Sequence, residues 1–180
     1  MVQIAWTTLP VYTDGPALTA AMLNAIKGNI NESAAAKATG AGKYYVSTAA
    51  NTLAERQIEQ DITINSDTRT ITTYGALASA GPSITMTTST RALMWFQASM
   101  KSNTAGANTY VSIDISGATN IDSDDERAIT SSSAIVDNYE RFSGCHLATL
   151  TAGSNTFKHE YRVDSNTGTF RYRRLQLMGF

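Results

Sequence analysis

Two stretches near the end of the sequence decide the fold: Asn155 to Val163, which reads NTFKHEYRV, and Thr169 to Met178, which reads TFRYRRLQLM. In the first stretch Phe157, His159 and Tyr161 occupy alternate positions. Alternation of this kind places the three rings on one face of an extended strand. We therefore expect a strand that buries an aromatic face against a second layer.

The second stretch changes phase along its length. Phe170 and Tyr172 are expected to share one face, and Leu175 and Leu177 share a face that is offset by one residue. One extra residue in a strand produces such an offset, because two residues then oppose one on the partner strand. The sequence predicts a β-bulge near Arg173-Arg174.

The same two-residue period runs through most of the chain after residue 68. Turn clusters such as Ala80-Gly81-Pro82 separate the strands, and no helical pattern lies between them. Short strands joined by turns favour an antiparallel β-sandwich over a parallel sheet. The further predicted strands are 69–74, 83–88, 91–101, 109–115 (with Val111, Ile113 and Ile115 on one face) and 139–150.

The chain divides into three zones by pattern. Residues 69–180 form the predicted sandwich, and residues 43–68 form a transition segment. Within that segment, residues 58–64 change from helix-favouring to strand-favouring residues, so the pattern does not decide between a helix and a strand there. Residues 1–42 form an N-terminal arm. The fold class expected is therefore all-β with an N-terminal helical arm.

The arm carries the sequence's one helical signal. Asp14-Gly15-Pro16 predicts a turn with proline near the first helical position, and Gly40 is a plausible stop. An alanine-rich helix of this length is marginal alone, so it must dock. The sequence leaves three docking surfaces for this helix: its own domain, copies of the chain in an oligomer, or a different protein. The residues expected to make the anchoring contacts are Trp6, Leu18, Met22, Leu23, Ile26 and Ile30.

Composition excludes several classes of protein. The 180 residues carry 14 Lys+Arg against 15 Asp+Glu, and charged residues make up 16%, below the quarter that is typical of soluble domains. A net charge of −1 provides no general attraction for nucleic acid or an anionic membrane. One cysteine excludes an intrachain disulfide. The 25 threonines and 17 serines suit strand surfaces that also meet a neighbouring subunit.

Few residues suggest chemistry. The acidic run 122–126 (DSDDE) has the oxygen ligands that Ca²⁺ prefers, but it lacks the spacing of a calcium loop, and a solvated loop is favoured. His146 and His159 could lie near each other in neighbouring strands, although structural histidines are the more common case. Cys145 is interpreted as a small buried hydrophobe. We expect no catalytic set, no cofactor and no metal site, and hence no enzyme.

A basic cluster closes the chain. Arg171, Arg173 and Arg174 join Lys158 and Arg162, with aromatic residues interleaved. Such a surface can stack the bases of single-stranded nucleic acid. Salt bridges within the sheet or between subunits are the favoured use, because the acidic run balances the cluster.

Two stretches resemble a known group of proteins. Trp6 through Ile30, with Asp14-Gly15 and Leu23-Asn24, looks like the N-terminal segment of tailed-bacteriophage virion proteins. Leu150 through Leu177 is similar to the closing hairpin of trimeric jelly-roll domains of the tumour-necrosis-factor and complement type, as found in phage fibre tips and capsid decoration proteins. The resemblance implies a jelly-roll sandwich, a homotrimer, and a structural role without enzymatic activity. The chain lacks the shaft repeats of a long fibre.

These observations lead to one preferred function and two competitors. The preferred function is a virion-located, trimeric decoration (cement) protein on the outer surface of a bacteriophage capsid, with the major capsid protein or another virion protein as partner. The first competitor is a tail fibre or tail-tip protein that recognises a host-surface glycan through loops near Tyr110 and Tyr139. The second competitor is a hydrolase that uses the acidic run and the histidines.

Overall fold

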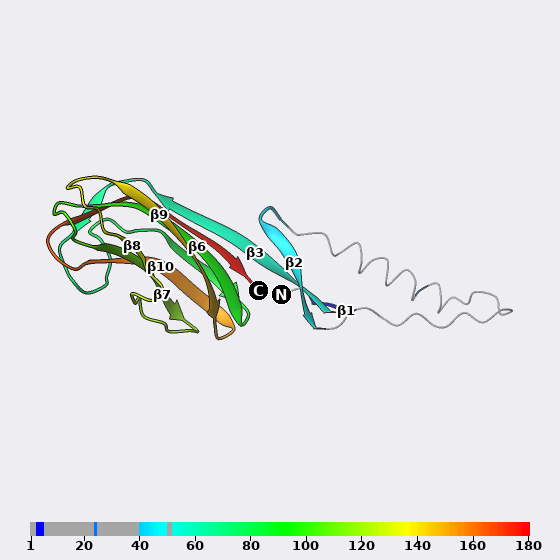
Figure 1. The fold of residues 1–180 in the computed structure, drawn as a ribbon. Coiled ribbons are helices and arrows are strands. Elements are labelled where there is room, and N and C mark those ends of the chain that lie inside the picture. The colour runs from blue at the N-terminus through cyan, green and yellow to red at the C-terminus, as the bar shows by residue number, and fades with distance from the viewer. Residues whose placement is uncertain (1–2, 6–23, 25–39, 50–51) are drawn as a thin grey trace. The chain divides into compact units, whose positions relative to one another are not determined.

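A computed structural model describes residues 3–5, 24, 40–49 and 52–180 of the chain (Figure 1). The chain divides into two compact units, residues 1–57 and 58–180. In the first unit, β1 (Gln3–Ala5) and β2 (Lys43–Ala49) both pair antiparallel with the beginning of β3 (Thr52–Thr63). Among the described residues there is no helix long and apolar enough to cross a membrane.

The second unit is built of strands alone within its described length. Of residues 58–64, which the sequence left open, residues 58–63 form the second half of β3. The strands that follow are β4 (Asp67–Arg69), β5 (Ser83–Thr88), β6 (Arg91–Ser102), β7 (Thr109–Gly117), β8 (Ile129–Ser131), β9 (Glu140–Thr149), β10 (Gly153–Val163) and β11 (Gly168–Gly179).

These strands form two antiparallel sheets, so the predicted β-sandwich is confirmed. The larger sheet has the order β3-β11-β6-β9, with β4 also paired to β11. The smaller sheet has the order β5-β10-β7-β8. The pairs are nested along the chain: β7 with β8, β6 with β9, β5 with β10 and β3 with β11. One long antiparallel ribbon is thus wound into two layers.

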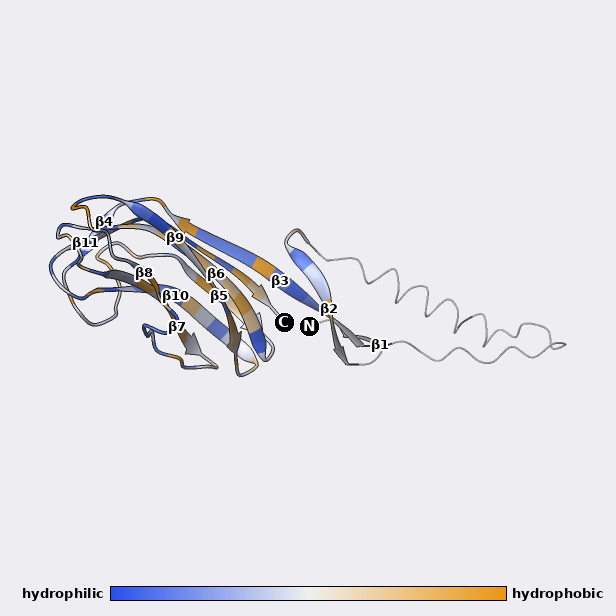
Figure 2. Cartoon of the chain, viewed as in Figure 1, coloured by the Kyte–Doolittle hydropathy of each residue, from blue (hydrophilic) through white to orange (hydrophobic). Residues whose placement is uncertain are grey.

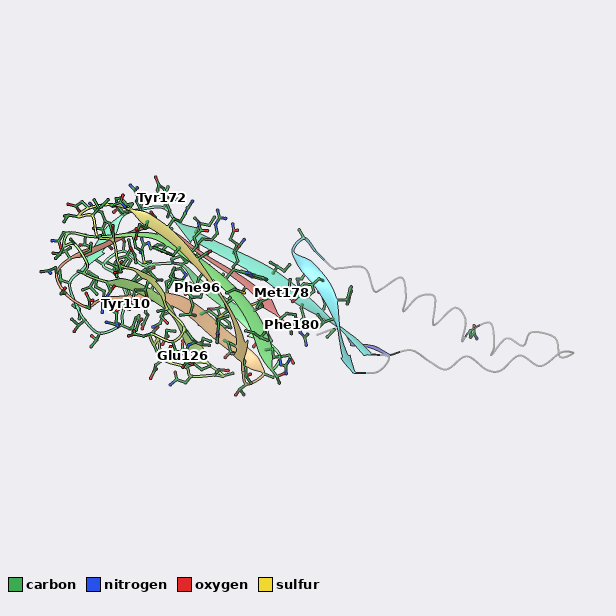
Figure 3. The ribbon with its side chains drawn as sticks, viewed as in Figure 1. Phe96, Tyr110, Glu126, Tyr172, Met178 and Phe180 are labelled. Atoms are coloured by element: carbon green, nitrogen blue, oxygen red, sulfur yellow. The ribbon has the colours of Figure 1, made fainter. Side chains whose placement is uncertain are left out.

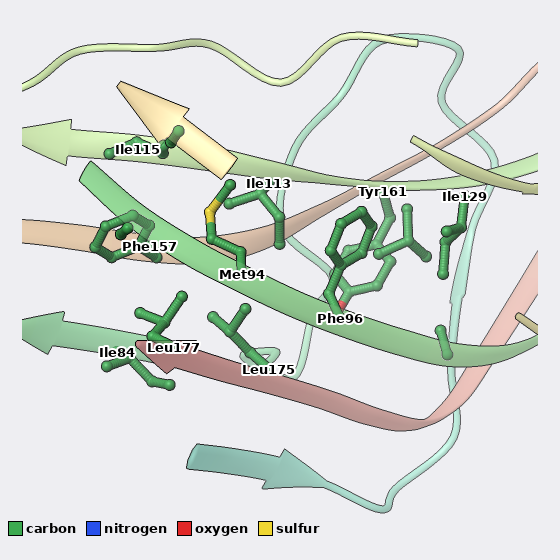
Figure 4. Close-up of a cluster of buried hydrophobic side chains, with 14 of the residues drawn as sticks. Ile84, Met94, Phe96, Ile113, Ile115, Ile129, Phe157, Tyr161, Leu175 and Leu177 are labelled. Atoms are coloured by element: carbon green, nitrogen blue, oxygen red, sulfur yellow. The ribbon is translucent and has the colours of Figure 1, made fainter. Parts of the chain in front are cut away.

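The core lies between the two layers, where alternate residues of each strand are buried (Figure 4). β10 contributes Phe157 and Tyr161, as the alternation in its sequence predicts, and β6 contributes Met94 and Phe96. At about 25 cal/mol per Å² of apolar surface removed from water, this layer supplies most of the stabilisation of the sandwich. The predicted inward face of β7 is confirmed, because Val111, Ile113 and Ile115 are all buried.

The predicted bulge in β11 is confirmed, and it lies one residue earlier than expected. The register against β6 shifts between Arg171 and Arg174, and Tyr172 has a φ of 49°. Phe170 and Tyr172 therefore do not share a face, as the sequence suggested: Phe170 is buried, whereas Tyr172 is 47% exposed. The bulge instead turns Arg173 into the interior, where it is fully buried.

The prediction of a strand over residues 69–74 is wrong. β4 ends at Arg69, and the chain then turns. The Arg69 guanidinium donates hydrogen bonds to the carbonyls of Thr73 and Ala76, at 2.8 and 2.7 Å. These bonds satisfy backbone acceptors that a strand ladder would otherwise need. Of the predicted arm helix, Asn24 alone is among the described residues, and the rest of that helix lies outside them.

Asn155 joins two loops at one end of the sandwich. Its side chain is fully buried, and its Oδ1 accepts a hydrogen bond of 2.7 Å from the backbone N–H of Thr119. Its Nδ2 donates to Thr88 Oγ1 at 2.8 Å and to the Thr151 carbonyl at 3.0 Å. A buried amide that is satisfied on both sides holds these loops in one arrangement.

Candidate functional site

The outer face of the smaller sheet is polar. Thr85, Thr156 and Ser116 lie side by side across β5, β10 and β7, and the hydroxyls of Thr85 and Thr156 are 2.8 Å apart. In the next row Lys158 Nζ lies 3.2 Å from a carboxylate oxygen of Asp114. It lies at the same distance from Glu160 on its own strand. This face is adapted to water.

The acidic run is tied to the same sheet by ion pairs. Arg162 Nε donates to Asp125 Oδ1 at 2.8 Å, and the Tyr74 hydroxyl donates to the same oxygen at 2.8 Å. The hydrogen bond from Arg162 holds the pKa of Asp125 below its usual range. Asp124 pairs with Arg127 at 2.7 Å. Within the described part of the chain, no three His, Cys, Asp or Glu side chains come together as metal ligands.

The basic cluster does not form one surface. Lys158 and Arg162 make ion pairs on the smaller sheet, as the preferred interpretation of the cluster predicted. Arg171 and Arg174 lie on the larger sheet, and Arg173 is buried between the layers. Because these five cations are divided among two faces and the core, they do not line one continuous groove for single-stranded nucleic acid.

The two tyrosines suggested for glycan contact are each covered by an arginine. The Arg162 guanidinium lies 3.7 Å from the centre of the Tyr110 ring. The Arg171 guanidinium lies 3.4 Å from the centre of the Tyr139 ring. A sugar ring cannot stack on a ring face that already carries a cation at contact distance.

The two histidines are not neighbours. His146 lies on β9 of the larger sheet and His159 on β10 of the smaller sheet. His159 is buried between the rings of Phe96 and Tyr161, with centroid distances of 6.1 and 6.0 Å. Burial, and secondarily the nearby Arg173 cation, lower the pKa of His159 to about 3. An imidazole held uncharged in a core is a structural group.

The interpretation of Cys145 as a buried residue is wrong. Its side chain is exposed on β9, directly beside Trp95 of β6. Residues on β9 alternate between the core and the outside, and Cys145 falls on the outward phase because Ala148 falls on the inward one. The sequence contains a single cysteine, so this is the chain's only thiol.

The outer face of the larger sheet differs sharply from that of the smaller one. Ile58, Met178, Leu93 and Leu147 lie in register across β3, β11, β6 and β9. Ile58 is 45% exposed and Leu147 is 50% exposed. We call these four residues the apolar row; Figure 2 shows hydrophobic segments interrupting the otherwise hydrophilic β3. Leu93 and Met178 between them are half-buried. An apolar row with exposed members makes this face a candidate interaction surface.

The adjacent row of the same face is also uncharged. It consists of Gln60, Gln176, Trp95 and Cys145, again side by side on the four strands. Trp95 is 40% exposed. Reasoning from sequence did not single out these residues, although a signal was present. In 91–101, Leu93 and Trp95 are apolar at positions that alternate with the core residues, so that strand is apolar on both sides.

The predicted anchoring residues of the arm, namely Trp6, Leu18, Met22, Leu23, Ile26 and Ile30, lie outside the described residues. The outer face of the larger sheet is therefore a second candidate surface, made of residues that the structure describes. Figure 3 labels Met178, the member of the apolar row on β11, and Tyr110 and Glu126 on other parts of the sandwich.

No protein-family model and no curated protein sequence matches this chain. Solved structures similar to it include particles derived from infectious bursal virus, with a TM-score of 0.49 and 10% identity over 74% of this chain and 35% of that chain. The VP2 subviral particle of infectious bursal disease virus has a TM-score of 0.48 and 8% identity, over 74% of this chain and 36% of that chain. This chain spans about a third of the length of these capsid chains.

Proposed function

We propose that this chain is a structural virion protein whose jelly-roll sandwich assembles into a trimer that decorates the outer surface of a bacteriophage capsid. The observation that carries the proposal is the contrast between the two outer faces of the sandwich. One face is covered with hydroxyls and ion pairs, and the other has eight adjacent uncharged positions that include Trp95. Exposed apolar surface of this kind is retained where a protein is built to associate.

The strand pairing supports the jelly-roll part of the proposal. Nested pairs, from β7 with β8 outward to β3 with β11, are what a ribbon rolled into two sheets produces. The resemblance of Trp6–Ile30 and Leu150–Leu177 to phage virion proteins supports the location. In this proposal the arm contacts the major capsid protein or another virion protein, and the sandwich contacts its own copies.

Co-sedimentation with capsids tests the proposal. Purified full-length chain is mixed with capsids that lack it, and bound protein is measured after centrifugation. Removing residues 1–40 should abolish capsid association and leave the oligomer intact. Full occupancy of capsids by the shortened chain would contradict the role of the arm, and cryo-electron microscopy of decorated particles would distinguish a capsid site from a tail site.

A matched pair of substitutions tests the predicted apolar stripe more finely. Met22→Asp and Ile26→Asp together place two charges on the stripe, whereas Asn24→Asp adds a charge at an exposed position beside it. Only the double variant should lose capsid binding. Equal loss in both would mean that charge, and not apolar burial, governs the attachment.

A further inference from the structure

Trp95 stands between two hollows on the outer face of the larger sheet. The hollow on its β11 side has a volume of about 290 Å³ and is lined by Ile58, Trp95, Gln176, Leu177 and Met178. The other has a volume of about 140 Å³ and is lined by Trp95, Phe96, Gln97, Ser143, Arg174 and Gln176. A projecting indole and a hollow large enough to receive an aromatic side chain thus lie on one face.

Both hollows are smaller than the typical site for a small molecule. Such sites are concave and have volumes of about 300–1,000 Å³. The hollow beside Met178, at about 290 Å³, lies at the lower limit of that range, and the other, at about 140 Å³, lies below it. A side chain presented by another protein surface fits them better than a free ligand.

The two central rows of this face carry no charge that would repel a copy of the same chain, and Arg174 lies in the next row. The apolar row and the row that contains Trp95 carry no charged side chain at any of their eight positions. In a symmetric assembly a surface meets the same surface, or an adjoining part of it, on a copy. A charged row would then bring like charges together, whereas an uncharged row does not.

We propose that the outer face of the larger sheet is covered by a second copy of this chain, with Trp95 of one copy seated in the hollow beside Ile58 and Met178 of the next. The inference deepens the proposed function, because it names the surface through which the sandwiches associate. A central aromatic in an apolar pocket, surrounded by near-neutral contacts, is the usual form of an energetic hot spot. The amides of Gln60 and Gln176, which hydrogen-bond at 2.7 Å, flank that pocket.

Light scattering on the full-length chain tests the surface with a matched pair of variants. Trp95→Lys places a charge on the proposed contact, and Thr156→Lys places the same charge on the polar face of the smaller sheet. We expect wild type and Thr156→Lys to have a mass that is a multiple of 19.3 kDa. Trp95→Lys should weaken self-association by roughly 30-fold or more, as loss of a hot spot does. If Trp95→Lys does not fold, Leu147→Lys on the edge strand β9 replaces it in the same measurement of self-association.

The single thiol reports on the same face without any engineering. Cys145 lies directly beside Trp95, so a second copy should shield it from a bulky maleimide. The alkylation rate of the wild type should fall as protein concentration rises, and the rate of Trp95→Lys should not.

Three results would overturn the inference. The first is a wild-type chain that is monomeric at every concentration with a freely reacting Cys145, which leaves the face uncovered. The second is a monomer with a protected Cys145, which assigns the face to a segment of the chain itself. The third is an oligomer that Trp95→Lys leaves unchanged. A dimer would support the inference and contradict the trimer, and self-association without capsid binding would contradict only the proposed function.

Discussion

The buried histidine makes the stability of the sandwich depend on pH in a way that can be calculated. His159 is buried between Phe96 and Tyr161, and neither ring nitrogen has a hydrogen-bond partner among the described residues. Its pKa is lowered from 6.5 to about 3, chiefly by burial. The unfolded chain therefore binds a proton between these two values that the folded chain does not bind.

The sign and the size of the effect follow from that difference. The contribution of His159 to the free energy of unfolding is fully present above pH 6.5 and is lost as pH falls through the window from 6.5 to about 3. Each pKa unit corresponds to about 1.36 kcal/mol. At about pH 4.5 the loss relative to neutral or higher pH is thus about 3 kcal/mol, a large part of the stability of an ordinary domain.

Substitution by phenylalanine isolates this contribution. His159→Phe keeps a ring in contact with its two aromatic neighbours and removes the titrating group. The free energies of unfolding of wild type and variant, from urea denaturation followed by circular dichroism, should diverge by about 3 kcal/mol between about pH 7.5 and pH 4.5, with the variant the more stable in acid. Other groups that titrate in acid, such as Asp125, contribute to both proteins and cancel in the difference.

A second histidine provides the control for the substitution itself. His146 is half-buried on β9, and His146→Phe is measured in parallel under the same conditions. Protein concentration is held constant, since assembly would otherwise alter the apparent stability. A wild-type and a His159→Phe curve that run parallel over the whole range would refute the assignment of a depressed pKa to this residue. If His159→Phe does not fold, His159→Leu makes the same comparison.

Three further predictions concern backbone and buried polar groups. Gly117→Ala should lower the free energy of unfolding by at least about 2 kcal/mol, because φ is 108° and a Cβ would lie 2.5 Å from the Ser154 carbonyl oxygen. Gly106 also has a positive φ but lies in open space, so Gly106→Ala should cost only about 1 kcal/mol. Equal losses for the two variants in urea denaturation would contradict the steric clash at Gly117. Asn155→Ala should lower the free energy of unfolding by about 3 kcal/mol and raise the rate of proteolysis in the two loops that the amide joins. A decrease in the free energy of unfolding below about 1 kcal/mol would show that the amide is not needed to order these loops. Arg173→Met should leave the free energy of unfolding unchanged or raise it near neutral pH, because Nε and Nη1 of this buried cation have no hydrogen-bond partner among the described residues. A decrease in the free energy of unfolding above about 2 kcal/mol would mean that interactions within the fold compensate the buried charge.

The positions of the strands were largely predictable, because a two-residue period is a local property. The predicted 83–88 strand matches β5 at both ends, and the predicted 91–101 strand ends one residue before β6 does. The failure at 69–74 has a local cause as well. RTITTY has strand-forming residues, but Arg69 bonds to carbonyls a few residues ahead and stabilises a turn, which residue preferences do not reveal.

The candidate surface was harder to anticipate. Leu93 and Trp95 are visibly apolar on the outward phase of their strand, yet the row they belong to exists only because β3, β11, β6 and β9 are adjacent. Those strands are far apart in the sequence, and their order depends on how the whole ribbon is wound. The same winding separates His146 from His159, which the sequence had left as potential neighbours.

The sequence by itself determined the all-β class of residues 69–180, the buried faces of β7 and β10, and the presence of a bulge in β11, since each depends on residues within a few positions of one another. Only the tertiary structure decided which faces meet water. Strand order placed hydroxyls and ion pairs on one outer face and an uncharged row with Trp95 on the other, and the exact place of the bulge turned Arg173 inward and Tyr172 outward. The physical reason is that alternation assigns a residue to one side of its own strand, whereas the composition of a surface is set by the neighbours that long-range pairing brings beside it.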